Sequence, residues 1–232
     1  MEKLEYQKLI DLRDYLFEFI SENKKKLFQK NIENRMRHLT IVLENIYQPH
    51  NASAVLRSCD IFGVQDVHII ENDNKYTLSE EVAMGSSKWL NMYKYSQDEE
   101  NTLSCFQHLR EEGYTIVATT PHNNDMLLDE LPIDQKTALV FGAEVNGISQ
   151  LAIDNADAFV KIPMYGFTES FNISVSAALS MFSFTEKLRK STVHWQLSDV
   201  EKLQIQIDWA KASIKKSAMI VQDFEKNKYS KQ

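Results

Sequence analysis

Short apolar runs rich in β-branched residues recur through the middle of the chain, with polar or helix-like sequence between them. They occupy residues 39–45, 67–70, 90–95, 114–120, 137–141 and 159–163. Runs of this length and composition are typical of β-strands. Helical patterns lie between or after them, at about 51–62, 99–112, 149–156 and 172–186. Alternating strands and helices predict a mostly parallel α/β sheet with helices on both faces.

Three polar loops follow strands of this predicted sheet, at 46–51, 142–147 and 163–171. Ligands of such sheets bind beyond the C-terminal ends of the strands, so we expect these loops to form one site. The middle loop, GAEVNG, lacks both the spacing of a dinucleotide fingerprint and the Gly-Lys-Ser/Thr of a phosphate-binding loop. Its acid, Glu144, favours a ribose or an amine, because a carboxylate repels phosphate. The residues alone also allow a plain glycine turn and a solvated Glu144.

The segment after the first strand predicts a helix with one buried apolar face. Asn51 is expected to cap the N-terminus of this helix, and Gly63 is expected to end it. The periodicity places Asn51 and Arg57 outside the buried face. At this point a purely structural interpretation, with Asn51 as a cap and Arg57 as a surface charge, stays open.

Composition places the chain among ordinary globular proteins, with 43% hydrophobic and 25% charged residues. No apolar run approaches the roughly 18 residues of a membrane span, and the N-terminus lacks the apolar stretch of a signal peptide. Cys59 and Cys105 have no metal-ligand spacing and suit a reducing compartment. We therefore expect a cytoplasmic protein without membrane association or a structural metal.

Charge is unevenly distributed along the chain, whose net charge is −7. Residues 1–37 hold nine Lys/Arg and seven Asp/Glu, residues 186–232 hold ten and six, and the middle holds seven and twenty. Amphipathic helices are predicted near both ends, over 3–31 and 198–228. Basic ends of an acidic protein can bind a phosphate backbone, because salt confines electric fields to about 10 Å. Simple packing of solvated helices explains these segments equally well.

Three motifs, in order, give the chain a resemblance to a known family. They are NASAVLR at 51–57, LVFGAEVNGIS at 139–149 and IPMYGFTESFNISVS at 162–176. These motifs resemble those of the SPOUT superfamily of RNA methyltransferases, and the lead-in LENIYQPHN with the basic helical tails resembles its TrmH branch. The resemblance divides the chain into an N-terminal helical extension at 1–37, a SPOUT methyltransferase domain at 38–189 and a C-terminal helical extension at 190–232.

The resemblance implies a fold, a reaction and partners. The fold of this superfamily is an α/β-knot, in which the C-terminal segment threads through a loop as a deep trefoil. The TrmH branch methylates the ribose 2′-oxygen of guanosine 18 in the D-loop of tRNA. The resemblance therefore implies S-adenosylmethionine as the cofactor, tRNA or another structured RNA as the partner, and a homodimer.

Matched position by position, the motifs also imply which residues act. The reaction centre would contain Arg57, Asn51, Glu144, Ser170 and Asn172. The cofactor would lie against Ala118, Thr119, Thr120, Gly142, Glu144, Gly147, Ile162, Met164 and Ser174. Because an arginine is almost always protonated, we expect Arg57 to bind a substrate phosphate and stabilise the developing alkoxide rather than act as a base.

Two positions depart from the pattern of the branch. Gln48 stands where related proteins often carry lysine, and Glu169 stands where they often carry glutamine. Both changes make the site more acidic, so a different RNA substrate stays open. One alternative function is ribose methylation of ribosomal RNA or of another tRNA position. The other is an RNA-binding or assembly module without catalysis. Small residues on the 172–186 helix fit both core packing and close packing in a dimer.

Overall fold

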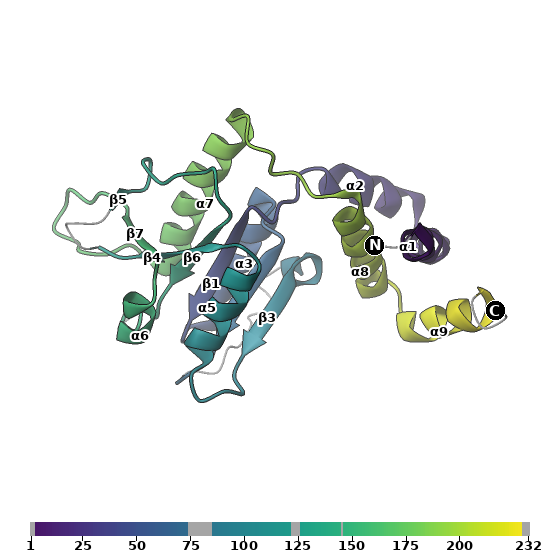
Figure 1. Cartoon of the computed structure of the whole chain (residues 1–232), viewed down its shortest axis with the longest axis horizontal. Coiled ribbons are helices and arrows are strands. Elements are labelled where there is room, and N and C mark those ends of the chain that lie inside the picture. The colour runs from purple at the N-terminus through teal and green to yellow at the C-terminus, as the bar shows by residue number, and fades with distance from the viewer. Residues whose placement is uncertain (1–2, 74–84, 122–125, 145, 229–232) are drawn as a thin grey trace. The chain divides into compact units, whose positions relative to one another are not determined.

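The computed structural model describes residues 3–73, 85–121, 126–144 and 146–228 (Figure 1). The chain forms two compact units. One is Met36–Trp195, and the other combines Met1–Arg35 with Gln196–Gln232. In the described ranges, no helix has the length and apolar character needed to cross a membrane.

The described residues of the first unit contain a seven-stranded sheet in which neighbouring strands pair in parallel. Its order is β3-β2-β1-β6-β4-β7-β5. The strands are β1 (Leu39–Glu44), β2 (Asp66–Ile70), β3 (Asn91–Tyr95), β4 (Thr115–Thr119), β5 (Met126–Leu127), β6 (Thr137–Phe141) and β7 (Ala158–Lys161). The mostly parallel α/β sheet is confirmed. The two-residue β5 was not predicted.

Helices cover both faces of this sheet, as predicted. On one face α3 (Pro49–Phe62) packs against α7 (Ile173–Lys190), with the 3-10 helix η1 (Ser86–Trp89) beside α3. On the other face lie α5 (Asn101–Glu111) and α6 (Gln150–Asp154). Each face has its own apolar core, because side chains alternate along a strand: Ile41 and Leu43 belong to the α3/α7 core, and Val42 belongs to the α5/α6 core. Figure 1 shows this three-layer arrangement.

The start of α3 corrects one prediction. The helix begins at Pro49, with Gln48 in the N-cap position, so Asn51 is not the cap. Proline is favoured in the first turn of a helix, because its missing N–H has no intrahelical partner there. Asn51 therefore lies inside the first turn and is buried, with 3% of its surface exposed, which contradicts the prediction that it lies outside the buried face. Arg57 is exposed and Gly63 ends the helix with φ 81°, both as predicted.

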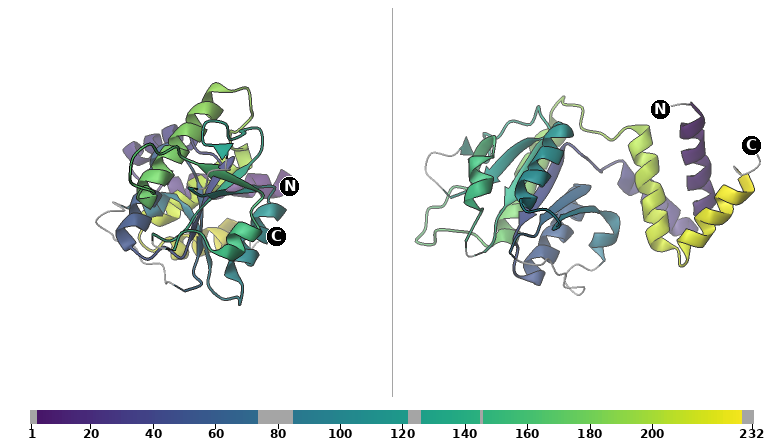
Figure 2. Two further views of the ribbon diagram at one scale, coloured as in Figure 1. Left: turned by 90° about the vertical axis from the view of Figure 1, so that its left-hand side faces the viewer. Right: turned by 60° about the horizontal axis from the view of Figure 1, so that its bottom comes forward.

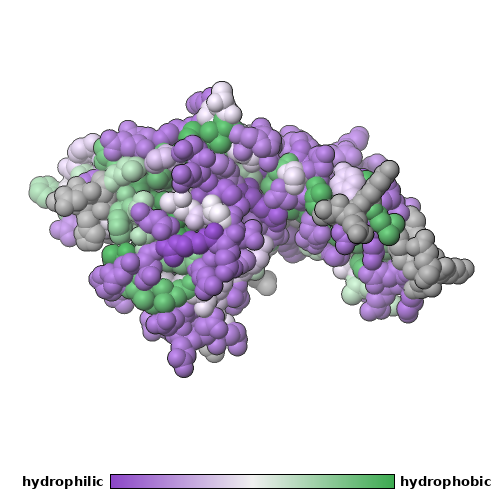
Figure 3. Space-filling view, viewed as in Figure 1, coloured by the Kyte–Doolittle hydropathy of each residue, from purple (hydrophilic) through white to green (hydrophobic). Residues whose placement is uncertain are grey.

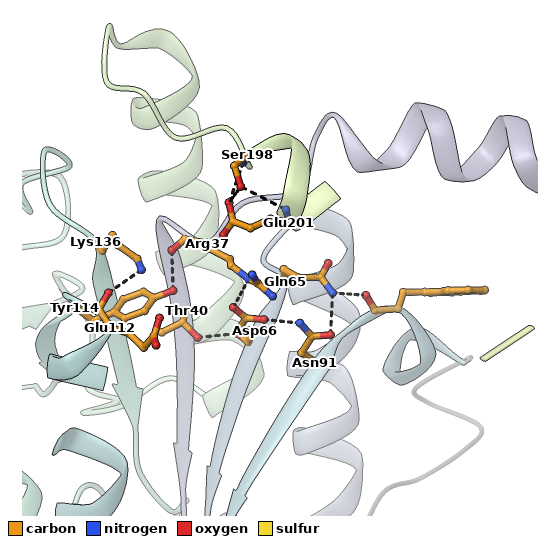
Figure 4. Close-up of polar contacts among 11 residues, drawn as sticks. Arg37, Thr40, Gln65, Asp66, Asn91, Glu112, Tyr114, Lys136, Ser198 and Glu201 are labelled. Atoms are coloured by element: carbon orange, nitrogen blue, oxygen red, sulfur yellow. Dashed lines mark hydrogen bonds and ion pairs between the residues drawn. The ribbon is translucent and has the colours of Figure 1, made fainter. Parts of the chain in front are cut away.

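A polar cluster joins the first three strands at the sheet edge opposite the predicted site (Figure 4). The carboxylate of Asp66 contacts Arg37 Nε at 2.9 Å and accepts from Asn91 Nδ2 at 2.8 Å. The Thr40 hydroxyl donates to the Asp66 carbonyl at 2.7 Å. Because Asp66 is buried, its contacts with Arg37 and Asn91 offset the cost of removing its charge from water.

The second unit is helical, and the right-hand view of Figure 2 shows its helices side by side. Its helices are α1 (Lys3–Phe17), α2 (Glu22–Ile32), α8 (Asp199–Ser213) and α9 (Ser217–Lys228). Helix α8 packs against the other three, and the Phe28 and Trp209 rings meet at 5.3 Å in its core. A capping box of Ser198 and Glu201 starts α8. The prediction of one long helix at 198–228 is wrong. The helical conformation is interrupted between α8 and α9, where Lys216 has φ 63°.

Candidate active site

A cavity of about 740 Å³ lies at the C-terminal ends of β4, β6 and β7, where the sequence predicted that loops would converge. Three loops or loop starts supply most of its lining: the end of β4, residues 141–150 after β6, and residues 160–173 after β7. Described residues of the lining include the apolar side chains of Ile148, Ile153, Ile162 and Met164, together with several serines, and they include no lysine or arginine.

The loop after β6 folds back on itself at the cavity wall. Ala143 and Gly147 exchange two backbone hydrogen bonds of 2.9 Å, which hold the two ends of the loop together. A Cβ atom at Gly142 would lie 2.1 Å from the carbonyl carbon of Gly147, so only glycine fits there. Gly147 itself has φ 69°, a conformation that other residues rarely adopt. The two glycines therefore shape the cavity as well as form a turn.

Side chains from two of the predicted loops, and from the residue directly after the third, meet in one polar network beside this cavity. Asn51 Nδ2 donates to Glu144 Oε1 at 2.9 Å, and Asn172 Nδ2 donates to Asn51 Oδ1 at 3.1 Å. Asn51 Nδ2 also approaches Gln48 Oε1 at 3.1 Å. Asn51 thus connects the loop after β1 to the loops after β6 and β7. Its burial makes this connection more rigid than a surface contact.

Asn172 connects the same network to helix α7. It is the N-cap of this helix, and its Oδ1 accepts from the backbone N–H of Ser174 at 2.9 Å and from the Ser174 hydroxyl. One amide therefore satisfies a free N–H of the first helical turn and fixes the position of Asn51. The start of α7 is positioned by the same contacts that position the loop after β1.

Among the described residues, the donors to Glu144 are all uncharged. Burial acts to raise its pKa, but hydrogen bonds from Asn51 and from the backbone N–H groups of Tyr47 and Gln48 together hold the pKa below its ordinary value. Each of these bonds favours the ionised form. Glu144 is therefore a carboxylate at neutral pH, and it faces a cavity that suits a cationic or hydroxyl-bearing ligand.

The structure brings most of the predicted residues to this place. The cavity is lined by Thr119, Thr120, Gly142, Glu144, Gly147, Ile162, Met164 and Ser170. Asn51, Asn172 and Ser174 belong to the adjoining network. Two predicted residues lie elsewhere: Ala118 is buried inside β4, and Arg57 is exposed on α3 and makes no ion pair or hydrogen bond with the described residues.

Sequence reasoning missed other residues of the site. Ser176 and Ser180 of α7 line the cavity, and so does Ser149, the N-cap of α6. Glu44, at the end of β1, is 1% exposed and binds Ser149. An acid directly after a continuous apolar strand was a usable signal, because a buried carboxylate needs specific donors. No group of three metal-ligating side chains occurs in the described parts of the chain.

Comparisons with known proteins agree with this geometry. Residues 38–182 match the model of the SpoU rRNA Methylase family. A tRNA (guanosine(18)-2′-O)-methyltransferase of Borreliella burgdorferi is 42% identical over 200 residues, which are 86% of this chain and 90% of that protein. The enzyme of the same name from Thermus thermophilus is 33% identical over 75% of this chain and 88% of its own length.

Solved structures give the same assignment. The TrmH/SpoU tRNA modifying enzyme of A. aeolicus superimposes with a TM-score of 0.75 and 27% identity, covering 84% of this chain and 98% of that one. The SpoU methyltransferase AviRb of Streptomyces viridochromogenes, solved with AdoMet, shares the fold at 19% identity and a TM-score of 0.57. Its matched part covers 70% of this chain and 62% of that protein. The chain therefore belongs to the SpoU methylase family.

Proposed function

We propose that this protein transfers a methyl group from S-adenosylmethionine to the 2′-oxygen of guanosine 18 in the D-loop of tRNA. The observation that carries the proposal is the polar network beside the cavity, in which Glu144, Asn51 and Asn172 are joined by hydrogen bonds of 2.9 and 3.1 Å. Relatives named for this reaction match most of the chain and most of their own length. Together these findings support one site and one reaction class.

The residues of the cavity fit S-adenosylmethionine. A volume of about 740 Å³ lies within the range of small-molecule sites, roughly 300–1,000 Å³. Apolar side chains such as Ile162 and Met164 suit the faces of an adenine, and serine hydroxyls suit polar edges. The absence of Lys and Arg from the described lining disfavours a nucleotide phosphate, and the Glu144 carboxylate favours a cation.

The chain would contribute positioning and electrostatics. When bound, S-adenosylmethionine supplies a methyl group on a positively charged sulfur. The buried Asn51 has both amide ends engaged, so it and Glu144 hold the loops at a fixed separation. Such alignment of reacting groups can lower a barrier by several kcal/mol. Ser170 lines the cavity, and Asn172 caps the start of α7.

Arg57 would act on the RNA. Its guanidinium is exposed and has no partner among the described residues, so it is available to bind the phosphate beside the target ribose. The same charge would stabilise the alkoxide that develops as the 2′-hydroxyl loses its proton. Because arginine keeps its own proton, the phosphate or a water molecule would accept the proton from the hydroxyl.

In vitro methylation tests the reaction and its site. Unmodified tRNA and ribosomal RNA would each be incubated with the protein and S-adenosylmethionine, and 2′-O-methyl groups would be mapped. We expect one methyl group at guanosine 18 of tRNA. Methylation of ribosomal RNA or of another tRNA position would replace the proposed substrate. Failure to bind the cofactor would favour an RNA-binding module without catalysis.

Substitution of Arg57 tests its role. Arg57→Lys keeps the charge and loses the two-pronged geometry, so we expect a large loss of kcat with an unchanged melting temperature. Arg110→Lys on α5 makes the same chemical change at a surface ion pair and serves as the control. Near-normal activity of Arg57→Lys would rule out any role that needs bidentate binding.

We also propose a homodimer that packs through α7. Val175, Leu179 and Phe182 are 40–55% exposed along one side of this helix, and Ile61 of α3 is 68% exposed. Figure 3 shows further apolar surface over the part of this unit that carries β5 and β7. Apolar side chains at helical spacing favour burial by a second copy. Sedimentation should show a dimer for the wild type and a monomer for Leu179→Lys; a monomeric wild type would contradict the interface.

Three finer points complete the proposal. The superfamily's trefoil knot would lie in the segment that includes the loops after β6 and β7, both of which wall the cavity. The helical unit would add RNA contacts through lysines of α2, such as Lys24 and Lys26. The protein would act in the cytoplasm, where tRNA is found, and its two cysteines are free and buried.

A further inference from the structure

Glu44 is a carboxylate in the interior of the unit Met36–Trp195. It ends β1 and is 1% exposed. Its described contacts include no lysine, arginine or histidine. A buried carboxylate without a cation is costly unless hydrogen-bond donors surround it. Every position of this strand is buried and would suit an apolar residue, so the carboxylate at its end needs an explanation.

Three donors from two other elements converge on Glu44. The Ser149 backbone N–H donates to Oε2 at 2.8 Å, and the Ser149 hydroxyl donates to Oε1 at 2.7 Å. The Thr102 hydroxyl of α5 donates to Oε1 at 2.7 Å. These are short, charge-assisted bonds. Glu44 therefore joins β1 to α5 and to the residue that begins α6.

Ser149 transmits this contact to the cavity. Its hydroxyl also accepts from the Ala152 N–H at 3.1 Å, which caps α6, and Ser149 itself lines the cavity. The described residues immediately before it, 142–144 and 146–148, are the cavity wall after β6. One end of this wall is fixed by β6, and Glu44 fixes the other end.

We propose that Glu44 is a positioning residue that holds the 142–149 loop in the shape that binds S-adenosylmethionine. The proposal rests on the proposed function for the identity of the ligand. Glu44 does not touch the cavity, so its effect must pass through Ser149. Thr102 is buried and also outside the lining, so it supports the loop only through Glu44.

Four variants separate this role from general stability. Glu44→Gln keeps the shape but turns an amide NH₂ toward donors, so at least one hydrogen bond to Glu44 is lost. Thr102→Val removes one donor at a distance from the cavity. The double variant combines both changes. Thr40→Val is the matched control, because Thr40 is a buried hydroxyl on the same strand whose hydrogen bond lies at the opposite edge of the sheet (Figure 4).

Hydrogen exchange of the protein without ligand is the first measurement. We expect faster exchange in residues 142–152 of Glu44→Gln and Thr102→Val, and wild-type exchange there in Thr40→Val. Because the Ser149 N–H is bonded to Glu44, its own amide should respond most strongly. Unchanged exchange of this segment in Glu44→Gln would overturn the proposal, whether or not the protein binds S-adenosylmethionine.

Calorimetric binding of S-adenosylmethionine is the second measurement. Loss of one bond to a charged group predicts a Kd raised about tenfold to a hundredfold in Glu44→Gln, with a smaller rise in Thr102→Val. KM for tRNA should stay near the wild-type value. Because both residues act through one contact, the rise in Kd of the double variant should be smaller than the two single effects combined. Wild-type affinity in Glu44→Gln, or fully additive effects, would refute the proposal; no binding by the wild type would instead refute the proposed cofactor.

Discussion

Replacing Asn51 with aspartate tests the polar network of the site with almost no change in side-chain shape. Asn51 is 3% exposed, and its Nδ2 lies 2.9 Å from Glu144 Oε1. In Asn51→Asp a carboxylate oxygen takes the place of that donor, so two carboxylates face each other at a similar separation. We expect a folded protein in which one of the two carboxyls binds a proton more readily than an isolated carboxyl would.

The size of the effect follows from the lost hydrogen bond. A bond to a charged group contributes about 1.5–3 kcal/mol, and one pKa unit corresponds to about 1.4 kcal/mol. The loss therefore raises the pKa of one carboxyl of the pair. Repulsion between the carboxylates adds to this shift, although the partial exposure of Glu144 weakens the repulsion by solvent screening.

The direction of the pH dependence is fixed by the same shift. In the unfolded chain both carboxyls have ordinary pKa values of about 4. The folded variant has one raised pKa, so its stability matches the wild type more closely below about pH 4. The deficit grows as the pH rises through that raised pKa and is complete at pH values above it.

Thermal unfolding of the wild type, Asn51→Asp and Asn51→Ala between pH 4.5 and 7.5 is the assay. For a chain of this size, 1 kcal/mol shifts the melting temperature by about 2–4 °C. We expect Asn51→Asp to melt about 3–10 °C below the wild type at pH 7 and to approach it at pH 4.5. Asn51→Ala loses the same bonds without adding a charge, so its offset should also shrink as the pH falls, but by less than the offset of Asn51→Asp. Parallel curves for Asn51→Asp and the wild type would refute the placement of Asn51 against Glu144.

Three other contacts give further predictions. Gly142→Ala would place a methyl group 2.1 Å from Gly147, so the Kd for S-adenosylmethionine should rise at least about tenfold; an unchanged Kd would contradict this close approach. Burial, with help from His108, lowers the pKa of His68 to about 3, so stability that is present above about pH 6.5 is lost as the pH falls toward 3. In urea titrations, His68→Phe should lose less stability over that range, and an equal loss would argue against a neutral buried His68. Glutamine at Lys24 and Lys26 should weaken tRNA binding and flatten its salt dependence by about one to two units of slope; an unchanged slope would exclude these lysines from the RNA contact.

The sheet was predictable because its strands are buried on both faces. Such strands appear in the sequence as continuous apolar runs, as in 39–44 and 137–141. Strand β5 has only two residues and exists through its pairing with β7, so no local pattern marks it. The break between α8 and α9 was equally hidden, since the residues around Lys216 continue the helical periodicity.

The site was predictable at the level of loops but less so at the level of contacts. Parallel strands bring their C-terminal ends to one edge, and this alone placed the loops after β1, β6 and β7 together. The orientation of Asn51 depends on a helix that starts three residues earlier than its cap-like sequence suggests. The hydrogen-bond donors to Glu44 are Thr102 and Ser149, which are 58 and 105 residues away in the chain. The local sequence around Glu44 therefore does not predict these contacts.

The two acids of the site explain how an acidic core can still present a cation to RNA. Residues 38–185 hold seven Lys/Arg and twenty Asp/Glu, so a free arginine there has many possible partners. Within the described residues, Glu44 and Glu144 are bound by hydroxyl, amide and backbone donors. Neutral donors stabilise these carboxylates without using a basic side chain. Arg57 consequently has no partner among the described residues. Its guanidinium is not paired with a carboxylate there and can bind a phosphate.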